Sequence, residues 1–304
     1  MNRLTIINEE LKQRLANEKT QYIGAIHHYT SPEGMKGILE SGNFWYTHAR
    51  FLNDSSECNY IYRLFPKFPD VYNESLLDEQ FFNLIRDISN SFLNNNYYKY
   101  DDENSIIADD IYVVSFSQDD DSLPLWNYYT KNNDSIGYNI SFSILPFDYS
   151  SMQFKFIHGS VIYDKDKQKE LLKEILLKYN EFFIDNKNQI NSNPNHKKNF
   201  IEQFINILEL YNIFFKHSAY EPEKEYRAVV YSVSNYAGMT RQFRTHKGLY
   251  IPYISLGYDK PCISRVNIAP NNNNDLYEYG TKMLLQTLGL NNLVVKNSGI
   301  PKQY

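Results

Sequence analysis

The chain has 304 residues, of which 42% are hydrophobic and 22% charged, a composition typical of a globular protein with one large domain or two small ones. Its net charge of −5 argues against a strongly basic nucleic-acid-binding protein. It has no apolar run near about 18 residues and no apolar signal-peptide core, so we expect neither a membrane-spanning helix nor a secretion signal. Cys58 and Cys262 lie far apart in unlike surroundings, which fits a reducing cytoplasm better than a disulfide framework.

The first half of the chain predicts alternating helices and strands. Residues 1–20 carry leucine and isoleucine at helical spacing, which indicates an amphipathic helix. A buried strand is expected at 22–30. A short helix should follow, with Ser31 as N-cap, Pro32 at its first position and Gly42 at its C-terminal end. Further strands are expected at 43–48, 111–118, 135–143 and 152–163, with a short helix at 122–131.

The second half differs in pattern. Residues 165–217 predict a helical insertion of two long helices, 166–183 and 197–217, separated by the polar segment 185–196. Strands are then expected at 224–234, 248–256, 262–270 and 292–297, with a last helix at 275–290. Because strands and helices do not alternate regularly, the order favours an α+β fold with a mainly antiparallel sheet, in one domain that spans 1–304.

Four polar segments stand at predicted strand ends and loops. They are "HHYTS" at 27–31, "ARFLNDSSE" at 49–57, "VVSFSQDDDSLPLWNYY" at 113–129 and "YEPEKEYRAVVY" at 220–231. In the last segment two glutamates are two apart at the mouth of a strand, so both carboxylates should share a face. No Gly-x-Gly-x-x-Gly or Gly-Lys-Ser/Thr loop is present, which excludes the usual Rossmann and P-loop routes to nucleotide binding.

These segments, with "VNIAP" and "VVKNSGIP", resemble a bacterial family catalogued as domain of unknown function 2971 over nearly the full length. The chain departs from the family pattern at Ala269, where glycine is expected, and in the length of the helical insertion. The family's frequent position beside defence genes implies a toxin or anti-phage defence effector.

A more distant resemblance is to ADP-ribosyltransferases. A strand ending in His-x-Thr, followed by a helix ending in Ile-Leu-x-x-Gly, is similar to the start of those enzymes. A tyrosine in the helix after the second motif strand and a glutamate opening a later strand follow in their order. The Glu-x-Glu pair at 223–225 resembles the arginine-modifying branch. The resemblance implies a split, mostly antiparallel sheet and NAD as substrate.

The resemblance also implies roles for particular side chains. A carboxylate near the ribose would stabilise an oxocarbenium-like state, an aromatic face would stack on nicotinamide, and an arginine would hold the pyrophosphate. The implied catalytic residues are Glu225, His28 and Tyr129, and the implied NAD-binding residues are His28, Thr30, Arg50, Ser115, Ser117, Trp126 and Glu223. Because neighbouring strand residues face opposite ways, we expect His28 to share the cleft face with Thr30 and His27 to be structural, beside Tyr29.

Simpler interpretations exist for each feature. His28 and Thr30 can be satisfied polar residues at a strand end, and Glu225 a surface cross-strand partner of Arg227 or of a lysine. The aromatic cluster Trp126, Tyr128 and Tyr129 can be core filling. The basic stretch 241–248 is more typical of a solvated turn than of a nucleic-acid groove. A metal site formed by His27, His28, His48, Glu57 and Cys58 matches no zinc spacing, so no metal is expected.

The leading hypothesis is therefore a cytoplasmic, NAD-consuming ADP-ribosyltransferase or NAD glycohydrolase. Its acceptor stays open between nucleic acid, protein and water, and the helical insertion is where we expect acceptor or protein-partner specificity. The alternatives are a non-catalytic interaction or sensor module on the same fold and, third, a nuclease that uses histidine and carboxylates.

Overall fold

The computed structural model describes residues 3–19, 22, 24–52, 59–73, 75–94, 111–129, 136–143, 147, 155–231 and 240–301. Glu57 and Cys58, weighed above as metal ligands, lie outside the described residues. The chain, predicted as a single domain, divides into two units. The helical unit is Met1–Gln21, Ala49–Asp110 and Val161–Ser218, and the sheet unit is Tyr22–His48, Ile111–Ser160 and Ala219–Tyr304.

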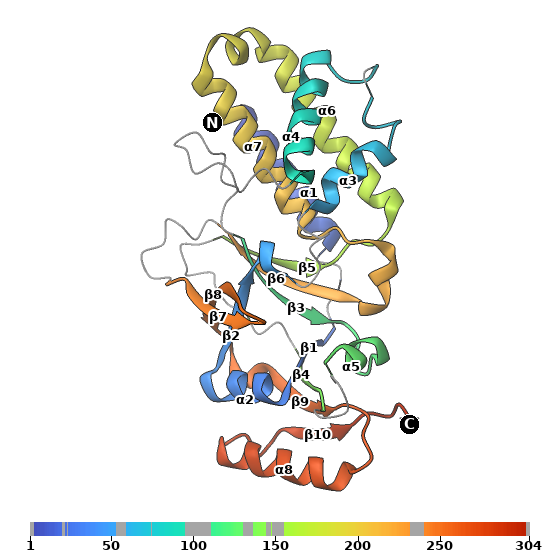
Figure 1. The fold of residues 1–304 in the computed structure, drawn as a ribbon, viewed down its shortest axis with the longest axis vertical. Helices are drawn as coiled ribbons and strands as arrows, with labels where there is room; N and C mark the ends of the chain where they lie inside the picture. Colours follow the sequence, from blue (N-terminus) through green and yellow to red (C-terminus); the bar gives the residue numbers. More distant parts are fainter. Residues whose placement is uncertain are drawn as a thin grey trace. The chain divides into compact units, whose positions relative to one another are not determined.

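The helical unit contains the predicted insertion together with more of the chain (Figure 1). Its α-helices are α1 (Arg3–Lys19), α3 (Tyr60–Leu64), α4 (Glu79–Leu93), α6 (Lys165–Ser192) and α7 (Pro194–Asn212). The two long helices of the insertion are confirmed, but the separating segment is almost entirely helical. Asn193 alone divides them, because its side chain accepts hydrogen bonds from the backbone N–H groups of Asn195 and His196 and so caps α7.

The core of the helical unit is built from α1, α4, α6 and α7. The predicted amphipathic helix at the N-terminus is confirmed as α1, which buries Leu4, Ile7, Leu11 and Leu15. Phe81 of α4 packs against aromatic rings of α6 and α7, with ring centroids 5.5–5.9 Å apart. The insertion is therefore part of a larger helical body and does not form that body alone.

Among its described residues the sheet unit has ten strands in one sheet. They are β1 (Ile26–Thr30), β2 (Asn43–His48), β3 (Tyr112–Ser117), β4 (Tyr138–Phe142), β5 (Lys155–Ser160), β6 (Glu225–Tyr231), β7 (Gln242–His246), β8 (Leu249–Gly257), β9 (Ile263–Ile268) and β10 (Val294–Asn297). The described pairings are antiparallel except for the parallel pair β9–β10, which confirms the mainly antiparallel prediction.

One strand of this sheet was missed. The basic stretch 241–248, expected to be a turn, forms β7 and the turn into β8. Lys247 and Gly248 both have positive φ, 50° and 82°, which fits the tight hairpin turns that match strand twist. The hairpin was not recognised because its first strand is polar and exposed and lacks the alternation of a half-buried strand.

The sheet branches at β3. One edge of β3 pairs along its whole length with β6. On its other edge β1 pairs at Ser117, while β2 pairs at Tyr112 and Val113. Two arms therefore leave the same edge, β1–β4–β9–β10 and β2–β8–β7.

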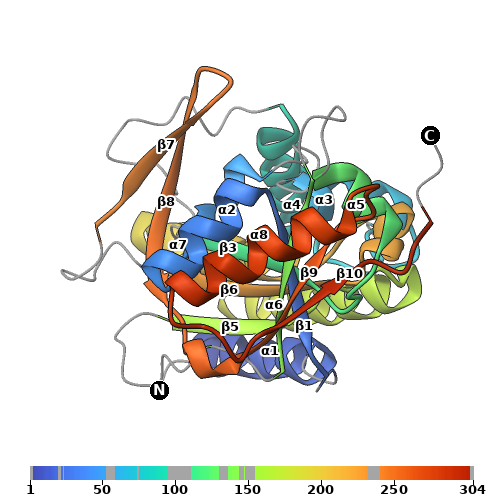
Figure 2. The same cartoon turned by 90° about the horizontal axis from the view of Figure 1, so that it is seen from below.

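The two faces of the sheet differ in character. One face is apolar and is covered by α2 (Pro32–Ser41) and α8 (Asn274–Thr287), which contribute Met35, Leu39 and Leu285 to the core (Figure 2). Helix α2 begins and ends as predicted: Ser31 accepts from the Gly34 N–H, and Gly42 adopts φ 68°. The other face carries α5 (Leu123–Tyr129), whose Trp126 packs on Tyr29 of β1.

Two glycines of α2 give a matched prediction. A Cβ at Gly34 would lie 2.1 Å from the Thr30 hydroxyl oxygen, whereas a Cβ at Gly37 meets nothing within 4 Å. Gly34→Ala should therefore lower the free energy of unfolding by about 1–3 kcal/mol, because Thr30 is buried and must shift. Gly37→Ala should raise it by about 0.5–1 kcal/mol through helix propensity. Urea denaturation of both variants tests this, and a Gly34→Ala protein as stable as wild type would contradict it.

Candidate functional site

Five polar residues lie directly opposite one another across five adjacent strands. Glu225 of β6 pairs with Ser117 of β3, Ser117 with His27 of β1, His27 with Ser141 of β4, and Ser141 with Arg265 of β9. Opposed residues of antiparallel strands point to the same face of a sheet. We call these five residues the polar row. It lies on the α5 face, because Tyr29, two residues after His27, packs against Trp126 of α5.

The predicted orientation of the two histidines is wrong. His28 and Thr30 lie on the opposite, apolar face, since strand residues alternate. The His28 ring packs edge-on against Phe44 and Phe116, at 5.1 and 5.5 Å, and its Nδ1 lies 2.9 Å from the Ser115 carbonyl oxygen. His28 is thus a core histidine on the other side of the sheet from Glu225. His27 lies on the face of Glu225, where His28 was predicted.

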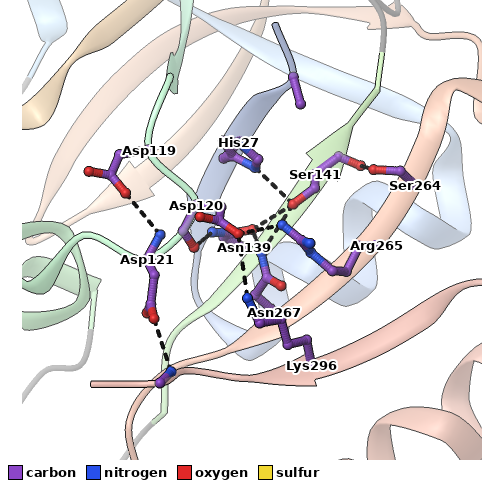
Figure 3. Close-up of polar contacts among 12 residues, drawn as sticks. His27, Asp119, Asp120, Asp121, Asn139, Ser141, Ser264, Arg265, Asn267 and Lys296 are labelled. Carbon is purple, nitrogen blue, oxygen red and sulfur yellow. Dashed lines mark hydrogen bonds and ion pairs between the residues drawn. The ribbon is translucent and has the colours of Figure 1, made fainter. Parts of the chain in front are cut away.

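His27 belongs to a buried hydrogen-bond network (Figure 3). Its Nδ1 lies 2.8 Å from the Ser141 hydroxyl, which donates to Asn139 Oδ1 at 3.2 Å. Asn267 Nδ2 donates to the same Asn139 oxygen at 2.7 Å and to Ser141 at 3.1 Å. Asn267 is 3% exposed, and its Oδ1 has no hydrogen-bond partner among the described residues. The network has unused acceptor capacity at that atom.

An acidic loop, Asp119–Asp121, lies beside this network. The Asp120 carbonyl accepts from Asn139 Nδ2 at 2.8 Å, and its carboxylate forms ion pairs with Arg265 and Lys296 (Figure 3). These aspartates are not among the site residues predicted from the sequence. The signal for them in the sequence was a run of three acids just after a strand that ends in small hydroxyl residues.

The neighbouring aspartates fix the loop itself. Asp121 accepts from the Trp126 indole at 2.8 Å and from the Gly299 N–H at 2.9 Å. Asp119 pairs with Lys224 at 3.0 Å. Asp119 and Asp121 therefore tie the end of β3 to α5, to the segment after β10 and to the residue before β6.

Glu225 is held by an arginine of its own strand. Arg227 Nε and Nη2 donate to the two carboxylate oxygens at 2.7 and 2.8 Å. The side chains are only 7% and 2% exposed, for Glu225 and Arg227 respectively. The simpler interpretation named the right partner, but the pair is buried and lies along one strand, not across two. A bidentate contact of this kind fixes the position of the carboxylate.

The two predicted serines do lie on the face of Glu225. Ser115 is opposite Arg227, and the Ser117 hydroxyl donates to the Glu223 carbonyl at 2.7 Å. Ser117 also accepts from the Asp119 N–H at 3.0 Å. Glu223 itself ends the short 3-10 helix Ser218–Glu223 and is half-buried.

The aromatic residues of α5 separate into two kinds. Trp126 is 1% exposed and packs edge-on to Tyr29 at 4.7 Å, so it is core filling. Tyr129 is half-buried, and its ring stacks against Tyr29 at 6.4 Å. Tyr129 therefore stays on the face of the polar row.

Arg50 belongs to the helical unit. Burial raises the pKa of Glu209 in that unit to about 7, while the hydrogen bond from Tyr62 and the positive charge of Arg50 oppose the rise. Glu209 is therefore an electrostatic partner of Arg50 within the helical unit. The structure does not group Arg50 with the other predicted site residues.

Residues 125–228 match the model of a family described as "Protein of unknown function (DUF2971)". The matched segment runs from α5 through the two long helices to the Glu225–Arg227 pair of β6. No curated protein and no solved structure matches the chain.

Two kinds of feature, a membrane-spanning helix and a metal-binding group of side chains, are absent from the described part of the chain. No helix there has the length and apolar character needed to span a membrane. Within the same residues, no group of three or more histidine, cysteine, aspartate or glutamate side chains is placed to hold a metal ion.

The two histidines of β1, His27 buried and His28 half-buried, should make the protein less stable in mild acid. Burial lowers the pKa of His27 and of His28 to about 4. Unfolded histidines bind protons below about pH 6.5, so the free energy of unfolding should fall as the pH drops from 6.5 towards 4. At pH 5 the loss should be roughly 1–2 kcal/mol for each histidine.

The test compares urea denaturation at pH 7.5 and 5.0 in wild type, His27→Gln and the exposed-site control His196→Gln. His27→Gln should remove about half of the histidine-dependent loss, and His196→Gln should remove none. The comparison of variants is needed because Glu209, whose pKa is raised to about 7, stabilises the fold as the pH falls below 7. An unchanged pH dependence in His27→Gln would contradict the assignment.

Proposed function

We propose that the chain cleaves the nicotinamide–ribose bond of NAD, as an ADP-ribosyltransferase or an NAD glycohydrolase. One observation carries the proposal: His27, Ser117 and Glu225 come from the three separate motif segments and are directly opposed on adjacent strands. The branching of the sheet at β3 is compatible with the proposal, since the β1 arm begins at Ser117, whereas the β2 arm begins at Tyr112 and Val113.

The chemistry assigns each group a task. The bond breaks through an oxocarbenium-like state, which the Glu225 carboxylate stabilises. Arg227 holds that carboxylate in place through its two N–H donors. His27 is uncharged at neutral pH, because its pKa is lowered to about 4 by burial, and can hydrogen-bond a ribose hydroxyl. The Tyr129 ring provides an aromatic face for nicotinamide.

A second candidate function is a non-catalytic interaction or sensor module on the same fold. The observation that favours it is burial: Ser117, His27 and Glu225 are 1%, 5% and 5% exposed. A polar row whose members bond to one another can also serve to specify strand register, since satisfied buried networks rigidify a fold.

Nicotinamide release from NAD separates the two candidates. The purified chain is incubated with NAD alone and with bacterial cell extract as a source of acceptors. Release in buffer indicates glycohydrolase activity, and release that requires extract, with label from NAD appearing on a macromolecule, indicates transfer. Expression in bacteria tests the toxin or defence role. No release under either condition would favour the non-catalytic module.

A further inference from the structure

The β7–β8 hairpin is a cationic element on an acidic chain. Residues 240–258 contain Arg241, Arg244, His246 and Lys247 and no aspartate or glutamate, whereas the whole chain has a net charge of −5. Strand β7 ends one arm of the sheet and is exposed along most of its length. Local charge of this sign attracts an anionic partner.

One face of this arm also presents an aromatic platform. The Trp45 ring of β2 stacks on Tyr253 of β8, with centroids 4.5 Å apart and planes inclined by 29°. Trp45 is nevertheless 49% exposed, so its ring has surface left for another flat group. Tyr253 of β8 lies directly opposite Thr47 of β2 and Gln242 of β7. Trp45 is two residues from Thr47, and Arg244 is two residues from Gln242, so both lie on this same face.

Arg244 is the cation of β7 that shares this face. Its Nη2 donates to the Thr47 hydroxyl at 3.0 Å. Its Nε is buried and has no hydrogen-bond partner among the described residues. A half-buried guanidinium without a carboxylate is costly unless an anion satisfies it. The side chain is half-buried, so an anion can reach the guanidinium only at the atoms that remain exposed and not at the buried Nε.

We infer that the Trp45–Tyr253–Arg244 face of this arm binds single-stranded nucleic acid. A base stacks on Trp45, and a backbone phosphate accepts hydrogen bonds from Arg244, the combination by which single strands are held without sequence readout. Inside a duplex both ring faces of a base are covered by stacking on the neighbouring base pairs, so a duplex should bind more weakly. The inference uses none of the polar row and stands independently of NAD cleavage.

The probe is a fluorescein-labelled oligo(dT) twelve nucleotides long, followed by anisotropy and by tryptophan emission. The chain has two tryptophans, and Trp126 is buried, so quenching on binding should come from Trp45. Trp45→Leu and Arg244→Gln should each weaken binding roughly tenfold, and Trp45→Leu should abolish the quenching. Arg244→Gln should also reduce the slope of log K against log salt by about 0.7.

Matched controls lie elsewhere on the sheet unit. Tyr279→Ala removes a 64% exposed ring from α8, and Lys36→Gln removes an exposed cation from α2; neither should change affinity. Thermal melts of every variant separate lost binding from lost folding. Trp45→Phe is a second variant at this position that keeps a stacking ring. Equal affinity of Trp45→Leu and wild type would overturn the inference. So would equal binding of a duplex, polyphosphate or an acidic peptide of the same charge.

Discussion

Glutamine at position 225 should slow NAD turnover by roughly 10²–10³-fold, with little change in NAD affinity. Glutamine keeps the shape of Glu225 but removes the negative charge that the proposed oxocarbenium-like state requires, and its amide oxygen can accept only one of the two hydrogen bonds from Arg227. The measurement is steady-state nicotinamide release over a range of NAD concentrations. The matched control is Glu221→Gln, an exposed acid just before β6, which should keep full activity.

Because Glu225 also binds Arg227, lost activity has to be separated from lost structure. The double variant Glu225→Leu with Arg227→Met replaces the buried pair by apolar side chains of similar size and should fold. It should nonetheless lack turnover, because the carboxylate is gone. A fully active Glu225→Gln protein would remove this residue from the mechanism, and Glu223→Gln would then be the next variant to test.

Breaking the Glu225–Arg227 pair should also be the most destabilising single change in the sheet unit. Glu225→Gln leaves the Arg227 guanidinium, 2% exposed, without the carboxylate that now accepts two of its hydrogen bonds. The expected cost is about 3–5 kcal/mol in the free energy of unfolding, since an uncompensated buried charge remains. From sequence alone we would expect little change, on the assumption that Glu225 lies at an exposed cleft rim; its burial overturns that expectation.

Urea denaturation of the single variants Glu225→Leu and Arg227→Met and of the apolar double variant measures the coupling between the two side chains. The double variant should lie within about 1 kcal/mol of wild type, because a buried ion pair can often be exchanged for apolar packing without loss. Lys282→Met breaks an exposed pair with Glu278 on α8 and should cost at most about 0.5 kcal/mol. Additive losses in the double variant would mean that the pair does not act as a unit.

Local features of this protein are readable from its sequence because their causes are local. Ser31, Pro32 and Gly42 delimit α2 through capping and backbone preference, which act within a few residues. The spacing of leucine and isoleucine gives α1 one buried, apolar face. Of the two glutamates expected at the mouth of a strand, Glu225 begins β6 and lies on the polar face, whereas Glu223 ends the preceding 3-10 helix.

Face and partner were decided by the tertiary structure. Alternation along β1 separates His27 from His28 but cannot say which of them shares a side with Glu225, because a one-residue change of register exchanges the faces. The pairing His27–Ser117–Glu225 settles that question, and it depends on strands about 90 and 200 positions apart in the chain. The β7–β8 hairpin was likewise hidden, since an exposed edge strand needs no apolar alternation and is held by its neighbour's hydrogen bonds. The sequence alone thus predicted most strands, the residues rich in chemistry and the helices α1, α2, α5, α6, α7 and α8, but not α3 or α4, while strand pairing determined which of those residues meet.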